Sequence, residues 1–360
     1  MNRTFNFNAG PAAIPLSVLE RAQKELVNFQ NTGMSIMELS HRSKEYERVH
    51  NHAKSLLTEL LAIPDTHEIL FLQGGASLQF TMIPMNFLVN QKTAHFVLSG
   101  SWSEKALAEA KLFGKTNVLA SSKSNNYSHI PQIASFEDGQ DDGAYMHITS
   151  NNTIYGTQWH EYPDSSIPLI ADMSSDILSK PLNIEKFSLI YAGAQKNLGP
   201  SGVTVVIVKK ELLATTSSNI PTLLNYETHI KNNSLYHTPP TFSIYMLSLV
   251  LEWAVEQGGL NIIQQNNEEK ANLIYSAIDE SDGFYTPHAE KNSRSLMNIT
   301  YTLPDEELTK KFLQQSAEQH FVGLAGHRSI GGCRASTYNA VPLEACEALA
   351  KFMTAFRKQN

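Results

Sequence analysis

Short apolar segments alternate with amphipathic ones through the first two thirds of the chain. The apolar segments predict strands at residues 68–72, 94–98, 145–148, 167–171, 188–191 and 203–208. Residues 203–208 are β-branched and apolar on both faces, which is typical of a strand buried inside a sheet. Residues 16–29 and 103–113 predict helices, the second ended by Gly114. Strands alternating with helices indicate an α/β fold whose sheet is mainly parallel and flanked by helices.

The pattern changes near residue 260, after an apolar helix at residues 243–257 that Gly258 and Gly259 end. Beyond it the pattern predicts helices at residues 268–278, 305–319 and 343–358, and strands at 297–302, 322–324 and 333–338. We therefore expect a large domain over residues 16–260. Residues 261–360 are expected to form a smaller α+β domain, together with an N-terminal arm at residues 1–15.

Composition narrows the function classes. The chain has 360 residues, of which 42% are apolar and 18% charged, as in an ordinary globular enzyme. The net charge of −7 argues against a general nucleic-acid binder. The two cysteines, Cys333 and Cys346, provide neither a disulfide framework nor a cluster of metal ligands. The sequence contains neither an apolar signal segment nor a run long enough to span a bilayer, so we expect a cytoplasmic protein with no membrane partner and no metal.

Lys196 and Asp172 carry the most informative chemistry. Lys196 follows one predicted strand among small residues, and Asp172 ends another. A lysine amine can form a Schiff base with an aldehyde cofactor, and a carboxylate beside the ring nitrogen of pyridoxal phosphate keeps that nitrogen protonated. A surface lysine and a helix-capping aspartate are the common structural explanations of each residue alone.

Other loops at the same predicted sheet edge supply further groups. Gly74 and Gly75 precede Ala76 and Ser77 between a strand and a helix, where backbone N–H groups can approach a phosphate. Trp102 lies between a predicted strand and helix and could stack on a planar ring, and Thr153 could donate a hydrogen bond to it. A plain turn and a packing tryptophan are the alternatives.

Two His-Arg pairs suggest an anion site. They are His41-Arg42 and His327-Arg328, and Arg334 follows the second pair. The planar guanidinium suits carboxylate and phosphate groups. This set predicts a substrate with more negative charge than a simple amino acid.

Taken together, these segments resemble the phosphoserine aminotransferases, which are fold-type I pyridoxal-phosphate enzymes, over essentially the whole chain. The resemblance rests on residues 6–11, 37–43, 74–80, 102–103, 171–175, 193–200, 238–242, 327–328 and 331–336. It implies transamination between 3-phosphohydroxypyruvate and glutamate in serine biosynthesis, and a possible role of 4-phosphohydroxythreonine as a substrate in pyridoxine biosynthesis. It also implies a homodimer with shared active sites.

The resemblance also implies a role for each residue. Lys196 would bind pyridoxal 5'-phosphate and move the proton, and Asp172 would pair with the ring nitrogen. Trp102 and Thr153 would contact the ring, and Ala76, Ser77 and Gln195 would hold the phosphate. His237 and Thr238 would reach the phosphate of the partner subunit's cofactor. The substrate would be bound through His41, Arg42, His327, Arg328 and Arg334.

The chain departs from the family pattern at His237, where an asparagine is usual. A histidine can donate to phosphate more strongly when protonated, so we expect cofactor affinity to depend on pH.

Two alternative functions stay open at this point. One is a desulfurase-type lyase on the same fold, which needs a nucleophilic cysteine. The other is a non-catalytic binder of phosphorylated metabolites, which would not need the Lys196–Asp172 pair.

Overall fold

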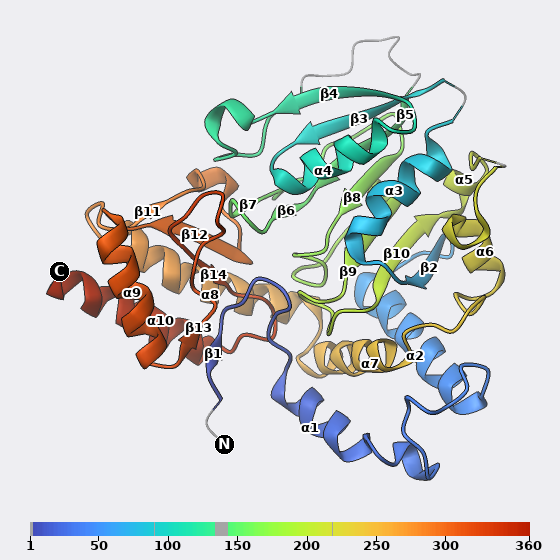
Figure 1. Ribbon diagram of the computed structural model, residues 1–360, viewed down its shortest axis with the longest axis horizontal. Coiled ribbons are helices and arrows are strands. Elements are labelled where there is room, and N and C mark those ends of the chain that lie inside the picture. Colours follow the sequence, from blue (N-terminus) through green and yellow to red (C-terminus); the bar gives the residue numbers. More distant parts are fainter. Residues whose placement is uncertain (1–2, 90, 134–142, 218) are drawn as a thin grey trace.

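The large sheet forms the centre of the molecule (Figure 1). The computed structural model describes residues 3–89, 91–133, 143–217 and 219–360. The sheet has seven strands in the order β2-β10-β9-β8-β5-β3-β4. These strands are β2 (His67–Leu72), β3 (Thr93–Leu98), β4 (Lys115–Ser121), β5 (Gly143–Thr149), β8 (Leu169–Asp172), β9 (Leu189–Gly193) and β10 (Thr204–Lys209). All neighbours are parallel except β10, which is antiparallel to β2 and β9, so the predicted mainly parallel sheet is confirmed.

Helices cover both faces of this sheet, because successive strand residues alternate between faces. On one face, Phe71, Ile148 and Ile190 pack in a cluster with α2 (Lys44–Leu61) and α7 (Thr241–Glu256). On the other face, Leu70, Tyr145 and Tyr191 pack with α3 (Gly75–Phe87), α4 (Ser101–Ala110) and α6 (Tyr226–Lys231). Both faces are therefore buried, as the continuous apolar strands predict.

A second, smaller arrangement follows in sequence and is coloured orange to red in Figure 1. Its antiparallel sheet consists of β11 (Thr286–Pro287), β12 (Asn298–Thr302) and β14 (Cys333–Ser336). Its apolar cluster includes α8 (Leu260–Asp279), α9 (Glu306–Glu318) and α10 (Leu343–Gln359). The N-terminal strand β1 (Phe5–Asn6) pairs in parallel with β13 (Phe321–Val322), and Phe7 belongs to the same cluster. These contacts agree with the expected small domain and arm, but the domain boundary at residue 260 stays a prediction.

The remaining elements are short. They are α1 (Leu16–Glu25), α5 (Lys210–Leu213), β6 (Asn151–Asn152), β7 (Thr157–Gln158), and 3-10 helices at Phe29–Asn31, Lys123–Asn125, Ile184–Lys186, Thr222–Leu224 and Lys291–Ser293. No helix among the described residues is long and apolar enough to cross a membrane.

Several predicted bounds need correction. The first helix ends at Glu25 rather than at residue 29. The helix expected to begin at residue 103 begins at Ser101, so Trp102 lies in its first turn rather than before it. The helix expected at residue 268 begins at Leu260, directly after the left-handed Gly259.

Candidate active site

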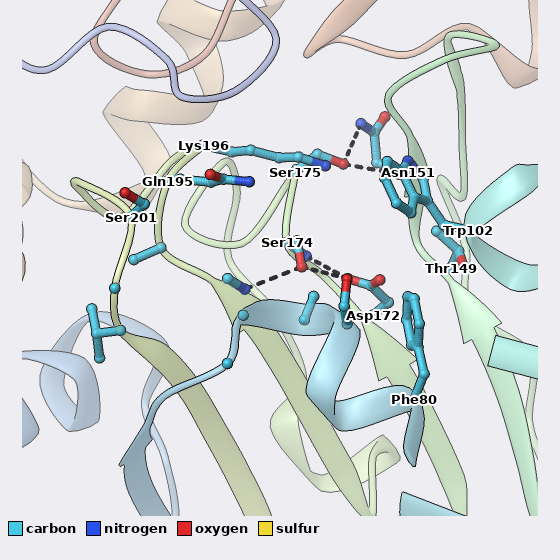
Figure 2. A pocket seen from close by; sticks show the side chains of 18 residues that line it. Phe80, Trp102, Thr149, Asn151, Asp172, Ser174, Ser175, Gln195, Lys196 and Ser201 are labelled. Atoms are coloured by element: carbon cyan, nitrogen blue, oxygen red, sulfur yellow. Dashed lines mark hydrogen bonds between the residues drawn. The ribbon is translucent and has the colours of Figure 1, made fainter. Parts of the chain in front are cut away.

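A cavity of about 450 Å³ opens at the carboxyl ends of the parallel strands. Ligands of open α/β sheets bind at this edge, where loops after different strands meet. Figure 2 shows its lining, with Lys196 above, Asp172 below and Trp102 at one side. The lining residues are Gly74, Gly75, Ala76, Ser77, Phe80, Trp102, Thr149, Asn151, Asp172, Ser174, Ser175, Gly193, Ala194, Gln195, Lys196, Ser201, Gly202 and Val203.

Lys196 enters the cavity from the loop after β9. Its Nζ donates a hydrogen bond to Thr153 Oγ1 at 2.6 Å. Burial lowers the pKa of the Lys196 amine to about 8, since desolvation disfavours the ammonium form, and nearby Arg334 lowers it further. The Asp172 carboxylate opposes this change. The neutral, nucleophilic form of this amine is therefore far more populated near physiological pH than that of an ordinary lysine.

Asp172 is the last residue of β8 and is 6% exposed. Its Oδ1 accepts hydrogen bonds from Ser174 N at 3.0 Å and from Ser174 Oγ at 2.6 Å. Burial raises the pKa of the Asp172 carboxyl, while Lys196, the Ser174 donors and the Tyr191 hydroxyl each lower it. The carboxylate is thus fixed in orientation and suited to hold a cationic group in the cavity.

The N-terminus of α3 forms an anion-binding wall. Gly74 caps the helix with φ of 89°, and a Cβ there would lie 2.5 Å from the Leu78 side chain, so only glycine fits. The first N–H groups of a helix have no partner within it and carry its positive partial charge. Ala76 and Ser77 present such groups to the cavity, and Gln195 lines it beside them. The cavity is therefore suited to a phosphate at this end.

Trp102, Thr153 and Arg334 lie around the Lys196 amine. Lys196 Nζ is 5.6 Å from the centroid of the Trp102 ring. Arg334, on β14, donates from Nη1 to the carbonyl oxygen of Thr153 at 3.0 Å. This contact brings a guanidinium of the small sheet to the loop that carries Thr153, next to the reactive amine.

Four predicted residues do not line this cavity, and three of them form a chain of contacts with Gln73. His237 Nε2 is 3.2 Å from Gln73 Nε2, which donates to the carbonyl oxygen of Thr238 at 3.2 Å. Thr238 Oγ1 is 3.3 Å from Nδ1 of His41, the neighbour of Arg42. These residues thus lie outside the cavity lining of their own chain, and their expected roles stay predictions.

His327 and Arg328 belong to a cationic group that also includes Arg334 and Lys105. Burial lowers the pKa of His327, and the charges of Arg334, Arg328 and Lys105 lower it further. Lys105 was missed, although it follows Trp102 by three residues on α4 and therefore shares its face. Its Nζ lies 4.5 Å from the centroid of the Trp102 ring.

Polar lining residues were also missed, because the local sequence marks only one of them. They include Thr149, Asn151, Ser174 and Ser175. The Asp-x-Ser spacing of Asp172 and Ser174, which allows a hydroxyl to reach the preceding carboxylate, is the one signal that could have identified a member of this set.

The two cysteines lie outside the cavity lining. Both are fully buried, and burial raises the pKa of each thiol to about 12. A thiol with such a pKa is a poor nucleophile, which removes the basis of the lyase alternative. Among the described residues there is also no group of three or more His, Cys, Asp or Glu side chains that could hold a metal ion.

Known proteins resemble this chain over its whole length. Residues 4–349 match the family model described as Aminotransferase class-V. The chain is 64% identical over 360 residues to the phosphoserine aminotransferase of Bacillus subtilis (strain 168), with 100% of both proteins covered. A phosphoserine aminotransferase structure concerned with radiation damage of the Schiff base superposes with a TM-score of 0.97 at 61% identity, covering 100% of both chains.

A more distant solved structure agrees. The PLP-bound phosphoserine aminotransferase from Trichomonas vaginalis has a TM-score of 0.93 and 39% identity, covering 98% of this chain and 99% of that chain. Family model, sequence identity and fold give the same assignment. The chain belongs to the class-V aminotransferases and, among them, to the phosphoserine aminotransferase family.

Proposed function

We propose that this protein is a pyridoxal-phosphate-dependent aminotransferase that transfers the amino group of L-glutamate to 3-phosphohydroxypyruvate, giving O-phospho-L-serine and 2-oxoglutarate for serine biosynthesis. The observation that carries the proposal is the enclosure of the Lys196 amine and the Asp172 carboxylate in one cavity whose wall is a helix N-terminus. A simple binder of phosphorylated metabolites needs the helix N-terminus but not the amine–carboxylate pair.

The residues present fit pyridoxal phosphate. Gly193 lines the cavity, and an added Cβ there would lie at ordinary contact distance, 3.4 Å, from the Ala76 backbone nitrogen, so a side chain would occupy cavity space beside the start of α3. Lys196 would hold the aldehyde, Asp172 the ring nitrogen, Trp102 one ring face and Thr153 the phenolic oxygen. Ala76, Ser77 and Gln195 would hold the phosphate. When bound, the cofactor supplies an electron sink for charge that develops at the substrate α-carbon.

The chain's own groups would then place the substrate and move its proton. Arg334 would bind the α-carboxylate, because its guanidinium reaches the Thr153 loop next to Lys196. Lys196, once freed from the cofactor, would carry the proton between the α-carbon and the cofactor carbon, since its pKa of about 8 lets it accept and release a proton near neutral pH.

The basic residues account for two substrates in one site. They would bind either the phosphate of one substrate or the γ-carboxylate of the other, because both groups are anions whose oxygens accept hydrogen bonds. These basic residues are His41, Arg42, His327 and Arg328. The same reasoning admits 4-phosphohydroxythreonine as a further substrate in pyridoxine biosynthesis. The cytoplasmic location stays a prediction from the sequence.

We also propose a homodimer with shared sites. His237 and Thr238 lie beside Gln73, and His41 contacts Thr238. These residues and Arg42, the neighbour of His41, are outside the cavity lining of their own chain. A second copy that presents this group to the neighbouring cavity would complete it, with His237 and Thr238 on the cofactor phosphate. Comparing the pH dependence of cofactor release in the wild type and His237→Asn tests the contribution of this histidine; equal profiles would contradict it.

The absorption spectrum of the purified protein tests the proposed reaction. We expect added pyridoxal phosphate to give a visible band that glutamate removes and 3-phosphohydroxypyruvate restores. Lys196→Ala should lose both the band and turnover, because the amine is the attachment point. A wild-type protein whose band glutamate leaves unchanged would contradict transamination. If the Lys196→Ala protein kept wild-type affinity for the phosphorylated substrate while the wild type had no turnover, the binder would be correct.

A further inference from the structure

A buried histidine and a buried tyrosine lie close to Asp172 in the large sheet, and neither has a role in the reaction proposed above. His147 is 2% exposed and Tyr191 is fully buried. His147 Nε2 is 2.8 Å from the Tyr191 hydroxyl oxygen. A hydrogen-bonding effect of the Tyr191 hydroxyl lowers the pKa of the Asp172 carboxyl, which places the two groups next to each other.

The strand register brings these three side chains together. Asp172 on β8 is paired with Tyr191 on β9 and with Thr149 on β5. His147 precedes Thr149 by two residues and therefore points to the same face of the sheet. The three side chains thus form a row across neighbouring strands, which a one-residue change of register would destroy.

The donors and acceptors that the three side chains offer determine the direction of each hydrogen bond in this row. The single Tyr191 proton can go to Asp172 or to His147, and a carboxylate is the stronger acceptor. The tyrosine oxygen must then accept from His147, which requires the proton of the neutral ring on Nε2. Burial lowers the pKa of His147 to about 3, so the ring is neutral, and its Nδ1 has no hydrogen-bond partner. An unpartnered lone pair at Nδ1 costs less than an unpartnered N–H group would.

We propose that His147 and Tyr191 are positioning residues that form a hydrogen-bond relay, His147 Nε2–H to Tyr191 O–H to Asp172, and thereby keep the Asp172 carboxylate ionised opposite the cofactor's ring nitrogen. A second relay, from Gly193 N–H through the Ser174 hydroxyl to Asp172 Oδ1, has distances of 3.1 and 2.6 Å. Both relays direct hydrogen-bond donors at the buried carboxylate and so favour its ionised form.

The need for the relays follows from the burial of Asp172. Desolvation favours the neutral carboxyl, so without donors the proton shared with a ring nitrogen would move to Asp172 and the ring would become uncharged. Four charged or titratable groups act on this row. The Lys196 charge favours the Asp172 carboxylate, whereas a charge on Asp176 repels it and attracts Lys196. The buried Tyr145 and Tyr226 act on Tyr191. None of these four groups takes the place of the Tyr191 hydroxyl as a hydrogen-bond donor to Asp172.

The inference rests on the proposed function, and nitrogen-15 NMR of bound, ring-labelled pyridoxal phosphate tests it separately from activity. We expect a pyridinium-type shift in the wild type and a shift towards neutral pyridine in Tyr191→Phe, with kcat lowered about tenfold or more and KM for glutamate changed less than about threefold, as expected for the loss of about one charge-assisted hydrogen bond. Tyr145→Phe is the matched control, since it removes a buried hydroxyl that has no partner, and it should behave as wild type.

A second pair of variants keeps the test decisive if Tyr191→Phe does not fold. His147→Gln keeps a side-chain donor and should retain the wild-type ring signal, whereas His147→Leu should move it towards neutral pyridine. A pyridinium-type signal that persists in both Tyr191→Phe and His147→Leu would overturn the relay. By contrast, a wild-type protein that forms no covalent complex with the cofactor would contradict the proposed function itself.

Discussion

At the residue scale, one physical cause acts in opposite directions on the two central groups. Burial raises the pKa of the Asp172 carboxyl and lowers the pKa of the Lys196 amine, because desolvation penalises whichever form is charged. Each charge partly offsets the penalty on the other. Lys196 can therefore lose its proton near neutral pH, while the Lys196 charge and the hydrogen-bond donors around Asp172 favour the ionised carboxylate.

The Lys196 pKa predicts how cofactor loading depends on pH. Only the neutral amine attacks an aldehyde, and its fraction grows as pH rises through the pKa of about 8 rather than through the ordinary value of 10.5. The rate at which cofactor-free protein takes up pyridoxal phosphate, followed by absorbance, should therefore level off above about pH 9. A free lysine analogue in the same buffers is the control, and a protein profile that coincides with it would contradict the lowered pKa.

Asp176 should make stability depend on pH. Burial raises the pKa of Asp176 from 3.8 to about 6, although Ser150 and Gln158 donate hydrogen bonds to it. The folded state therefore binds more protons than the unfolded state between these values, so the group's contribution becomes unfavourable as pH rises through this range and stays so above it. Asp176→Asn keeps the shape and removes the charge.

The expected result for Asp176→Asn is a free energy of unfolding higher than that of the wild type at pH 8, by up to about 3 kcal/mol, with the difference shrinking towards pH 4. Denaturant unfolding of the cofactor-free proteins across this pH range would measure it. A variant that is less stable than wild type by the same amount at every pH would show that the Asp176 charge itself is stabilising.

At the element scale, the sheet could be predicted from the sequence because its strands are buried on both faces. The edge strand β4 could not: it carries mixed polar and apolar residues and is largely exposed, so no period-2 pattern exists. α2 was overlooked although its signal is present, since Tyr46, Val49, Ala53, Leu57 and Leu61 recur at helical spacing on its buried side. Lys196 and Asp172 could be predicted as site residues because strand ends meet at one sheet edge, where an amine and a carboxylate carry distinctive chemistry. Thr149 ends β5 at the same edge, but a threonine there gives no comparable signal. The same is true of Asn151 and Lys105.

Helix α4 carries both Trp102 and Lys105, and Lys105 belongs to the cationic group around His327. This position gives a prediction. Lys105 is exposed, yet it lies over Trp102 and acts electrostatically on His327. An exposed charge interaction of this kind is worth about 0.5–1 kcal/mol, so Lys105→Gln should raise KM for 3-phosphohydroxypyruvate about two- to fivefold and leave kcat nearly unchanged. The effect should fade at high salt.

Lys111→Gln is the matched control, because Lys111 is also exposed but follows the last turn of the same helix. Steady-state kinetics of both variants at low and high ionic strength would measure the difference. Equal KM values for Lys105→Gln and Lys111→Gln would show that position 105 makes no special contribution to substrate binding.

At the scale of the whole molecule, a buried polar network joins the cavity wall at Asn151, on β6, to the small antiparallel sheet. Asn151 Nδ2 donates to Asn298 Oδ1 at 2.7 Å, and Asn298 Nδ2 donates to Ser336 Oγ at 3.0 Å and to the Tyr338 hydroxyl oxygen at 3.1 Å. Asn298 is fully buried and uses both ends of its amide. Since Ser336 lies on the same strand as Arg334, this network fixes the expected carboxylate-binding arginine relative to the cavity wall.

The shared-site proposal gives the largest-scale prediction, the recovery of activity in mixed dimers. Lys196→Ala and Arg42→Ala should each be inactive alone. If the Arg42 of one chain serves the cavity of its partner, a mixed dimer holds one site with both defects and one with neither. Random reassembly of equal amounts, by mild unfolding and refolding together, should then restore about a quarter of the wild-type sites.

A mixture of Lys196→Ala and Arg334→Ala is the control. It shows whether recovered activity comes from Arg42 acting in the partner's cavity or only from stabilisation of one variant by pairing with another. Arg334 bonds to the Thr153 loop of its own chain, and Thr153 bonds to Lys196 of that chain. Each site in that mixed dimer keeps one defect, so activity should not recover. Recovery in neither mixture, with dimers present in both, would mean that Arg42 acts within its own chain. Recovery in both would mean that Arg334 also crosses the interface, which the contact with Thr153 in a single chain contradicts.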